Sequence, residues 1–282
     1  SDIPGWITCI EDFPRHLSHV LRVYRPDYRV QGCVLVGPRG CGKMQLLQTA
    51  ARMCNYDIFA EKPDTPLEWS RMELRKALTT RQLKIFVFCS NGAALNSAEF
   101  AHYLLYLIKG HGLEEFEKSG SSTVRFAFTY DIGTAVPVDV KARPLPLPLL
   151  EISKHCTVDW IKGWSDEAIM RVAKYKYEEL SRNAKVDVDD ELTEVMFKFH
   201  RIVEQAVSDT LTEGMAMVFP PPILINDLVT AFFCCANQRC RQSDVRREEL
   251  NSALKAYEDL KANHTHLQAE HDRLIPIVQG AI

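Results

Sequence analysis

One run of residues has the composition of a phosphate-binding loop. It follows the pattern G-x-x-x-x-G-K and reads Gly37, Pro38, Arg39, Gly40, Cys41, Gly42 and Lys43. Glycines let a loop fold closely around a phosphate, exposed N–H groups and a helix N-terminus favour negative charge, and the lysine reaches the outer phosphates. The loop follows a short apolar run and precedes a helical pattern, as this chemistry requires. We therefore predict that it binds nucleotide phosphates.

The residues that would hydrolyse a nucleotide are largely missing. Met44 stands where a Ser or Thr hydroxyl usually binds Mg²⁺. The apolar strand predicted at 83–89 is followed by Ser-Asn-Gly, with no acid at its tip. Thr129 ends the next strand, where its hydroxyl can touch a γ-phosphate, and we take Asp131 as a turn residue. We predict ATP or ADP as ligand, Mg²⁺ as an optional companion without its usual ligands, no catalytic residue and no dedicated metal ligand.

The elements around the loop alternate between strand and helix. This alternation predicts a parallel α/β sheet flanked by helices over the first 160 or so residues. The proline-punctuated stretch 134–150 is expected to be an extended surface crossing. The strands are expected at 33–36, 57–60, 83–89, 124–129 and 158–160, and the helices mainly within 1–30 and at 67–80 and 100–108.

The remainder of the chain is predicted to be helical. Ser165 can cap a helix that runs to Leu180, and a second helix is expected at 189–213. After three consecutive prolines, a long helix is expected over 223–274, and the last eight residues do not continue its pattern. We predict a P-loop subdomain at 1–164, a helical lid at 165–222 and a long C-terminal helix at 223–282.

The long helix carries a heptad pattern with polar residues between its positions. The pattern favours a coiled coil, with an ordinary amphipathic helix packed on its own domain as the alternative. Three cysteines near its start are expected to be small buried residues, and two tryptophans four residues apart are expected in the core. The seam is Leu250, Ala253, Tyr257, Leu260, His264, Leu267, His271 and Leu274; the cysteines are Cys234, Cys235 and Cys240; the tryptophans are Trp160 and Trp164.

Composition narrows the function classes. The 282 residues carry a formal charge of −3, which gives no strong positive field for nucleic acid or an anionic membrane. No apolar run approaches the roughly 18 residues that cross a bilayer, and residues 1–6 lack the pattern of a secretion signal. Nine scattered cysteines favour reduced thiols over a disulfide framework or a zinc site. We therefore expect a cytoplasmic protein without nucleic-acid or membrane partners.

Several segments together resemble dynein heavy chains, and specifically the fourth of their six AAA+ modules. The similar segments are 17–25, 34–43, 46–51 and the lid entrance at 156–168, and the helix after the prolines resembles the base of the stalk. Ser90 or Asn91 replaces the family's acidic residue, Thr129 lies near its sensor asparagine, and His155 replaces a candidate arginine finger. The run 154–156 is somewhat more similar to the ciliary retrograde class.

The resemblance implies an ATP- or ADP-binding motor module with weak or no hydrolysis. The implied partners are neighbouring AAA+ modules of the same heavy chain, a second stalk helix and, indirectly, the microtubule. The implied location is the cytoskeleton, with a cilium or flagellum for the retrograde class. Two other functions stay open, an autonomous P-loop kinase or GTPase and a nucleotide-free structural pseudo-ATPase.

Overall fold

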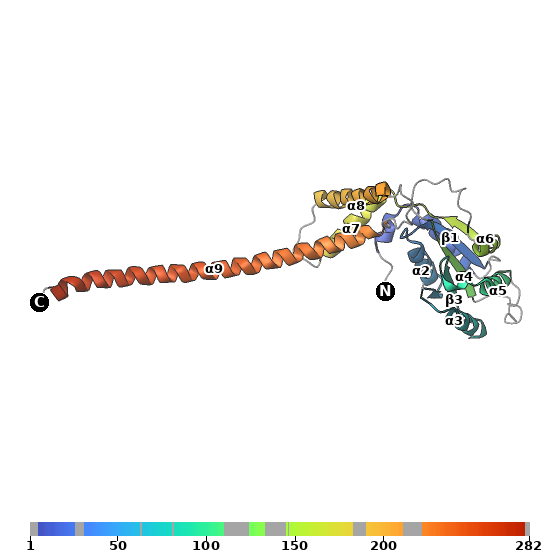
Figure 1. Cartoon of the computed structure of the whole chain (residues 1–282), viewed down its shortest axis with the longest axis horizontal. Coiled ribbons are helices and arrows are strands. Elements are labelled where there is room, and N and C mark those ends of the chain that lie inside the picture. Colours follow the sequence, from blue (N-terminus) through green and yellow to red (C-terminus); the bar gives the residue numbers. More distant parts are fainter. Residues whose placement is uncertain are drawn as a thin grey trace.

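The protein consists of an α/β body from which one long helix projects (Figure 1). The computed structural model describes residues 5–25, 31–62, 64–80, 82–109, 124–132, 145, 147–182, 190–210 and 222–279.

A five-stranded, all-parallel sheet forms the centre of the body. Its strand order is β2-β3-β4-β1-β5, so the strand that leads into the P-loop lies between β4 and β5. This topology fits the α/β AAA+ fold that the sequence predicts. The strands are β1 (Gly32–Pro38), β2 (Asp57–Ala60), β3 (Lys84–Cys89), β4 (Val124–Ile132) and β5 (Thr157–Trp160).

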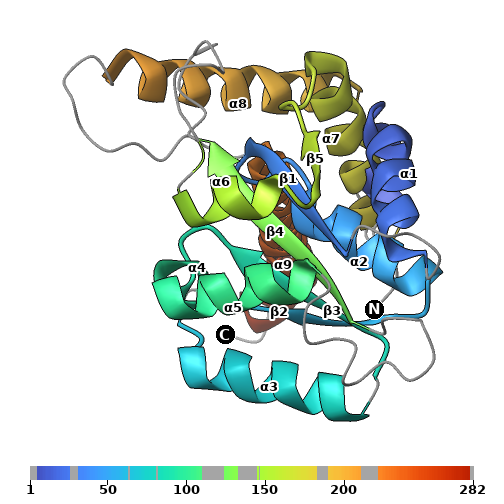
Figure 2. The same cartoon turned by 90° about the vertical axis from the view of Figure 1, so that its right-hand side faces the viewer.

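Helices cover both faces of the sheet (Figure 2). Ile85 and Val87 of β3 face a core shared with α1 (Phe13–Tyr24) and α2 (Lys43–Met53). Phe86 and Phe88, the alternate residues, face the opposite core. This alternation follows from the two-residue period of a strand. The opposite core is covered by α3 (Leu67–Thr80), α4 (Ala93–Asn96), α5 (Ala98–Ile108) and α6 (Leu147–Ser153).

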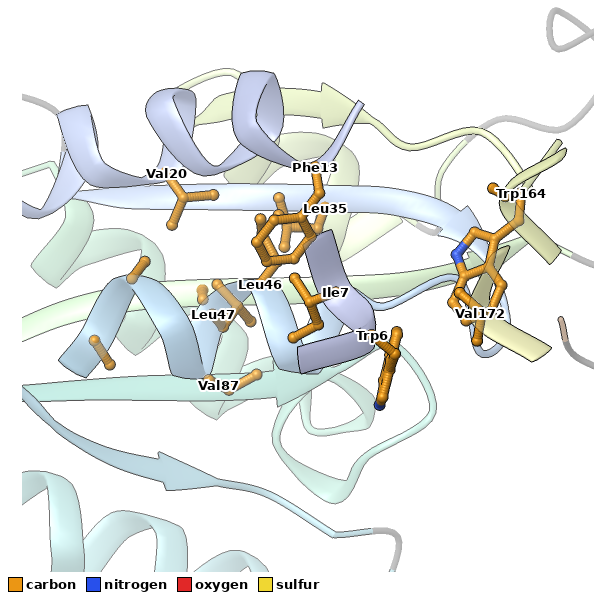
Figure 3. Close-up of a cluster of buried hydrophobic side chains, with 14 of the residues drawn as sticks. Trp6, Ile7, Phe13, Val20, Leu35, Leu46, Leu47, Val87, Trp164 and Val172 are labelled. Atoms are coloured by element: carbon orange, nitrogen blue, oxygen red, sulfur yellow. The ribbon is translucent and has the colours of Figure 1, made fainter. Parts of the chain in front are cut away.

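A helical subdomain continues the first of these cores. Ser165 caps α7 by accepting a hydrogen bond from the Ala168 N–H, which confirms the predicted helix start. Tyr177 of α7 meets Phe233 of α9 edge to face, with ring centroids 5.9 Å apart. Figure 3 shows Trp164 beside Val172 of α7, and the ring centroids of Trp6 and Trp164 lie 5.4 Å apart. The elements are η1 (Gly5–Cys9), α7 (Asp166–Ser181), α8 (Asp190–Thr210) and α9 (Leu224–Gln279).

Helix α9 leaves the body after its first three turns. Ile225, Val229 and Phe233 are buried against the helical subdomain, whereas every described residue of 239–277 is exposed. The leucines of the heptad seam are 52–68% exposed, so none of the described residues covers them. No described helix combines the length and apolarity that crossing a bilayer needs.

The structure corrects two predictions about element boundaries. Residues 147–153 form helix α6 instead of an extended segment, because Pro148 lies in the first helical turn, where its missing N–H is not needed. Helix α9 continues past 274 to Gln279, with Pro276 close enough to the end to interrupt only the last turn.

Two predictions about burial were also wrong. Trp160 is 44% exposed on an edge strand, although Trp164 is buried as expected. The three cysteines of α9 are exposed rather than buried, because Cys234 and Cys235 lie off the face that buries Phe233, and Cys240 lies in the projecting part of the helix.

Candidate nucleotide-binding site

The P-loop lies between β1 and α2, as the sequence predicts. Gly40 and Gly42 have φ angles of 74° and 100°, in a region of backbone conformation that residues other than glycine rarely adopt. Gly42 precedes the first turn of α2, and a Cβ added there would have no atom within 4 Å. The backbone at the helix N-terminus therefore faces open space, which is the geometry that an anion requires.

Lys43 folds back onto its own loop. Its ammonium donates hydrogen bonds to the carbonyls of Gly37 at 2.8 Å and Pro38 at 2.6 Å, and lies 3.7 Å from the Cys41 sulfur. It also forms an ion pair with Asp131 Oδ1 at 2.7 Å. The Gly37 and Pro38 carbonyls belong to the loop itself and stay beside the ammonium. A phosphate that binds Lys43 would therefore have to take the place of the Asp131 carboxylate.

Asp131 is therefore not the turn residue that we predicted. It belongs to β4, where it pairs with Gly37 of β1 in the parallel ladder. This register continues the strand three residues beyond Thr129, to Ile132, and brings the Asp131 carboxylate to the loop. The Lys43 side chain is 7% exposed and the Asp131 side chain 52%, so the ion pair is open to solvent from one side.

The segment after β5 holds the loop from the other side. Trp164 donates its indole N–H to the Cys41 carbonyl at 3.0 Å, and this bond is buried. A Cβ on Gly37 would lie 2.5 Å from the Ile161 carbonyl oxygen, so only glycine allows this close approach. Burial raises the pKa of the Cys41 thiol, which keeps it neutral within the loop. The loop is thus held on one side by the buried segment after β5 and on the other by the partly exposed ion pair with Asp131.

A cavity of about 180 Å³ adjoins the P-loop. It is bounded by Cys41 and Gly42 of the loop, by the start of α1, and by residues 161–165. This volume lies below the roughly 300–1,000 Å³ of whole-ligand pockets. The cavity is therefore large enough for only part of a nucleotide.

A further acid lies at the same edge of the sheet, and the sequence reasoning missed it. Glu61 follows β2, is 2% exposed, and accepts a hydrogen bond from the Ala94 N–H at 2.8 Å through Oε1. Its Oε2 is buried without a hydrogen-bond partner among the described residues. Burial raises the pKa of this carboxyl. The sequence offers one signal for this acid, because Glu61 directly follows a predicted strand. Its burial could not be predicted, because it depends on the contact with α4.

The carboxyl ends of β3 and β4 meet beside this acid. Thr129 is 9% exposed, and its hydroxyl donates toward the Cys89 sulfur at 3.6 Å. Cys89 is aligned with Thr129 in the ladder and donates toward the Glu61 carbonyl at 3.6 Å. Thr129 therefore lies on the same sheet edge as the loop, as expected. No acid from the tip of β3 joins it among the described residues.

The other predicted site residues are placed as follows. Arg39 is exposed at the turn of the loop, and Pro38 is partly buried. Met44 packs its side chain on the core under α2, so it offers the site only its backbone. His155 is exposed at the turn before β5.

Comparison with known proteins gives only a distant likeness. No family model matches the chain, and no curated protein matches it. Among solved structures, a point mutant of RuvB from Thermotoga maritima aligns with a TM-score of 0.48 and 16% identity. The alignment covers 78% of this chain and 67% of that RuvB chain.

Proposed function

We propose that this chain is a module that binds ATP or ADP and hydrolyses it weakly or not at all. The observation that supports binding is the open backbone at Gly42, which lies at the N-terminus of α2 and beside the cavity. Left-handed glycines, a helix N-terminus and a lysine within one loop fit a polyphosphate better than any other ligand.

Weak hydrolysis follows from what surrounds the loop. Met44 turns into the core and has no hydroxyl for Mg²⁺. The only acid that contacts the P-loop among the described residues is Asp131, and it is paired with Lys43. Glu61 is buried and partly committed to the Ala94 N–H. The described residues therefore fit a nucleotide but do not fit a tightly held Mg²⁺ ion, which normally takes oxygen ligands.

One observation favours a second function, that of a nucleotide-free structural module. The ammonium of Lys43 already has two carbonyls and a carboxylate as partners, so the loop is stable without a phosphate. An autonomous P-loop kinase or GTPase has no comparable support, since it needs a metal-binding hydroxyl and a strand-tip acid.

Binding of a fluorescent ATP analogue to the whole chain, with and without Mg²⁺, distinguishes these functions. We expect saturable binding that changes little with Mg²⁺, and no measurable phosphate release. Lys43→Ala should abolish binding, whereas Lys62→Ala, a substitution of an exposed lysine after β2, should leave it unchanged. No binding at millimolar nucleotide would support the structural module, and rapid turnover would support the autonomous enzyme.

We infer further that the module belongs to a dynein-type motor and connects its ring to a stalk. The projecting part of α9 supports this proposal, because its exposed leucine seam has the heptad spacing of a coiled coil. A single helix with such a seam needs a second helix to bury it. The proposed partners are that second stalk helix, neighbouring AAA+ modules and, through the stalk, the microtubule.

Self-association tests whether the seam is an unpartnered coiled-coil face. Sedimentation of the whole chain should show concentration-dependent association, because leucine seams pair with each other when their natural partner is missing. Leu260→Glu with Leu267→Glu should abolish it, whereas Lys261→Glu with Gln268→Glu, on neighbouring exposed positions, should not. Truncation after Gln242, which removes the seam but keeps the buried first turns of α9, should abolish association as well. Equal association of all variants would contradict the proposal.

A further inference from the structure

A cluster of two histidines and one aspartate lies outside the P-loop, between α1 and β5. His16 and His19 stand three residues apart on one face of α1, and Asp159 projects from β5. His16 Nδ1 lies 2.7 Å from Asp159 Oδ2, and His19 Nδ1 lies 3.4 Å from the same oxygen. One ligand atom from each residue falls within 4.8 Å of the other two.

We propose that these three residues bind a divalent transition-metal ion of the Zn²⁺ type. Two imidazole nitrogens and one carboxylate oxygen form a ligand set that zinc and related ions use, with a remaining position for water. Each side chain comes from a regular element packed on the core, so the set is held by the fold and not by a loop. We predicted no metal ligand there, because the local pattern of two histidines on α1 does not show that Asp159, 143 residues from His16, lies beside them.

The distances fit a metal after a small adjustment. Two ligand atoms that are each about 2.0–2.1 Å from a tetrahedral ion are about 3.3 Å apart. The His19–Asp159 distance of 3.4 Å already has this value. The His16–Asp159 distance of 2.7 Å is that of a hydrogen bond and must open by about 0.6 Å. We expect a small rotation of the Asp159 carboxylate to provide this change.

The burial of the cluster also fits a metal site. The His16 side chain is 4% exposed and that of Asp159 14%, whereas that of His19 is 47% exposed. Two ligands are therefore preorganised in the protein, and the third faces solvent, which gives the ion a path of entry. A carboxylate buried to this degree gains from a cation, because burying a charge without compensation is costly.

Metal binding would change the protonation of His16. Without a metal, the Asp159 carboxylate can only accept, so His16 donates a hydrogen bond to it from Nδ1. An ion bound to Nδ1 replaces that proton, so Nε2 is the only ring nitrogen left to carry one. Nε2 is buried without a hydrogen-bond partner among the described residues, and His16 also lines the cavity beside the P-loop. The metal site and the proposed nucleotide cavity therefore share one imidazole.

Titration with Co²⁺ tests the site, because bound Co²⁺ reports its ligands through visible absorption. The experiment uses the whole chain with Cys234, Cys235 and Cys240 changed to Ser, since exposed thiols bind the same metals. We expect one equivalent of Co²⁺ with a tetrahedral or five-coordinate spectrum and no thiolate charge-transfer band. Zn²⁺ should displace it and should raise the melting temperature.

His19→Ala is the decisive variant, because His19 is half exposed and its loss should not impair folding. Residues that only hydrogen-bond to a metal ligand contribute roughly 10–100-fold to metal affinity. Loss of His19, which would bind the ion directly, should weaken Co²⁺ binding by more than this. Asp159→Asn should weaken it as well, whereas His102→Ala, on an exposed position of α5, should not. Failure of the parent to bind one equivalent, or equal binding by parent and His19→Ala, would overturn the proposal. Neither result depends on nucleotide binding.

Discussion

Asp131→Asn is expected to tighten nucleotide binding. In the structure, the Asp131 carboxylate lies 2.7 Å from the Lys43 ammonium and competes with any phosphate for it. Because the Asp131 side chain is 52% exposed, the ion pair is worth about 1 kcal/mol, the upper end of the range for exposed pairs. Removing this competition should therefore lower the Kd of ATP about fivefold, since 1.4 kcal/mol corresponds to a factor of ten.

The assay is a titration of the fluorescent ATP analogue at low and high ionic strength without Mg²⁺. The gain should shrink with added salt, because the competing charges are partly exposed to solvent. Asp57→Asn is the matched control, since Asp57 is exposed at the opposite end of the sheet and should change nothing. Unchanged affinity would refute the competition, and a loss of affinity seen only with Mg²⁺ would show that Asp131 binds the metal.

Three further substitutions test the surroundings of the loop. Trp164→Phe leaves the buried Cys41 carbonyl without its donor and should lower the free energy of unfolding by about 1–3 kcal/mol in urea titrations; an unchanged midpoint would contradict this. Gly37→Ala should lower it by about 1–3 kcal/mol, because its Cβ would meet a backbone carbonyl at 2.5 Å, whereas Gly163→Ala, with only one contact at 3.9 Å, should be tolerated. Burial raises the pKa of Glu61, so this carboxyl costs stability as the pH rises above the unfolded value of about 4.3. Glu61→Gln should therefore match the parent near pH 4 and be more stable at pH 7, and a constant difference across this range would show that burial is not the cause.

The parts of the fold that depend on neighbours in the chain were predictable from the sequence. The P-loop, its strand and its helix follow one another directly, so local pattern was sufficient to place Gly37–Lys43. Ser165 could be placed as a cap because its partner is three residues away. The heptad seam of α9 was visible for the same reason, as a periodicity within one helix.

Contacts between distant segments could not be predicted in this way. The partners His16 and Asp159 are separated by 143 residues, and Trp164 and Cys41 by 123. The register between β1 and β4 determines that Asp131 reaches Lys43, and no local signal specifies a register between strands so far apart.

The anchoring of α9 has a mechanical consequence. The helix is held at one end by three buried side chains, and about 45 residues, or roughly 70 Å at 1.5 Å per residue, extend beyond them. A tilt of about 5° at the anchored end would displace the far end by about 6 Å, more than the pitch of one helical turn. Small rearrangements between Tyr177 and Phe233 would thus be amplified along the helix into sideways displacements of several ångströms at its far end.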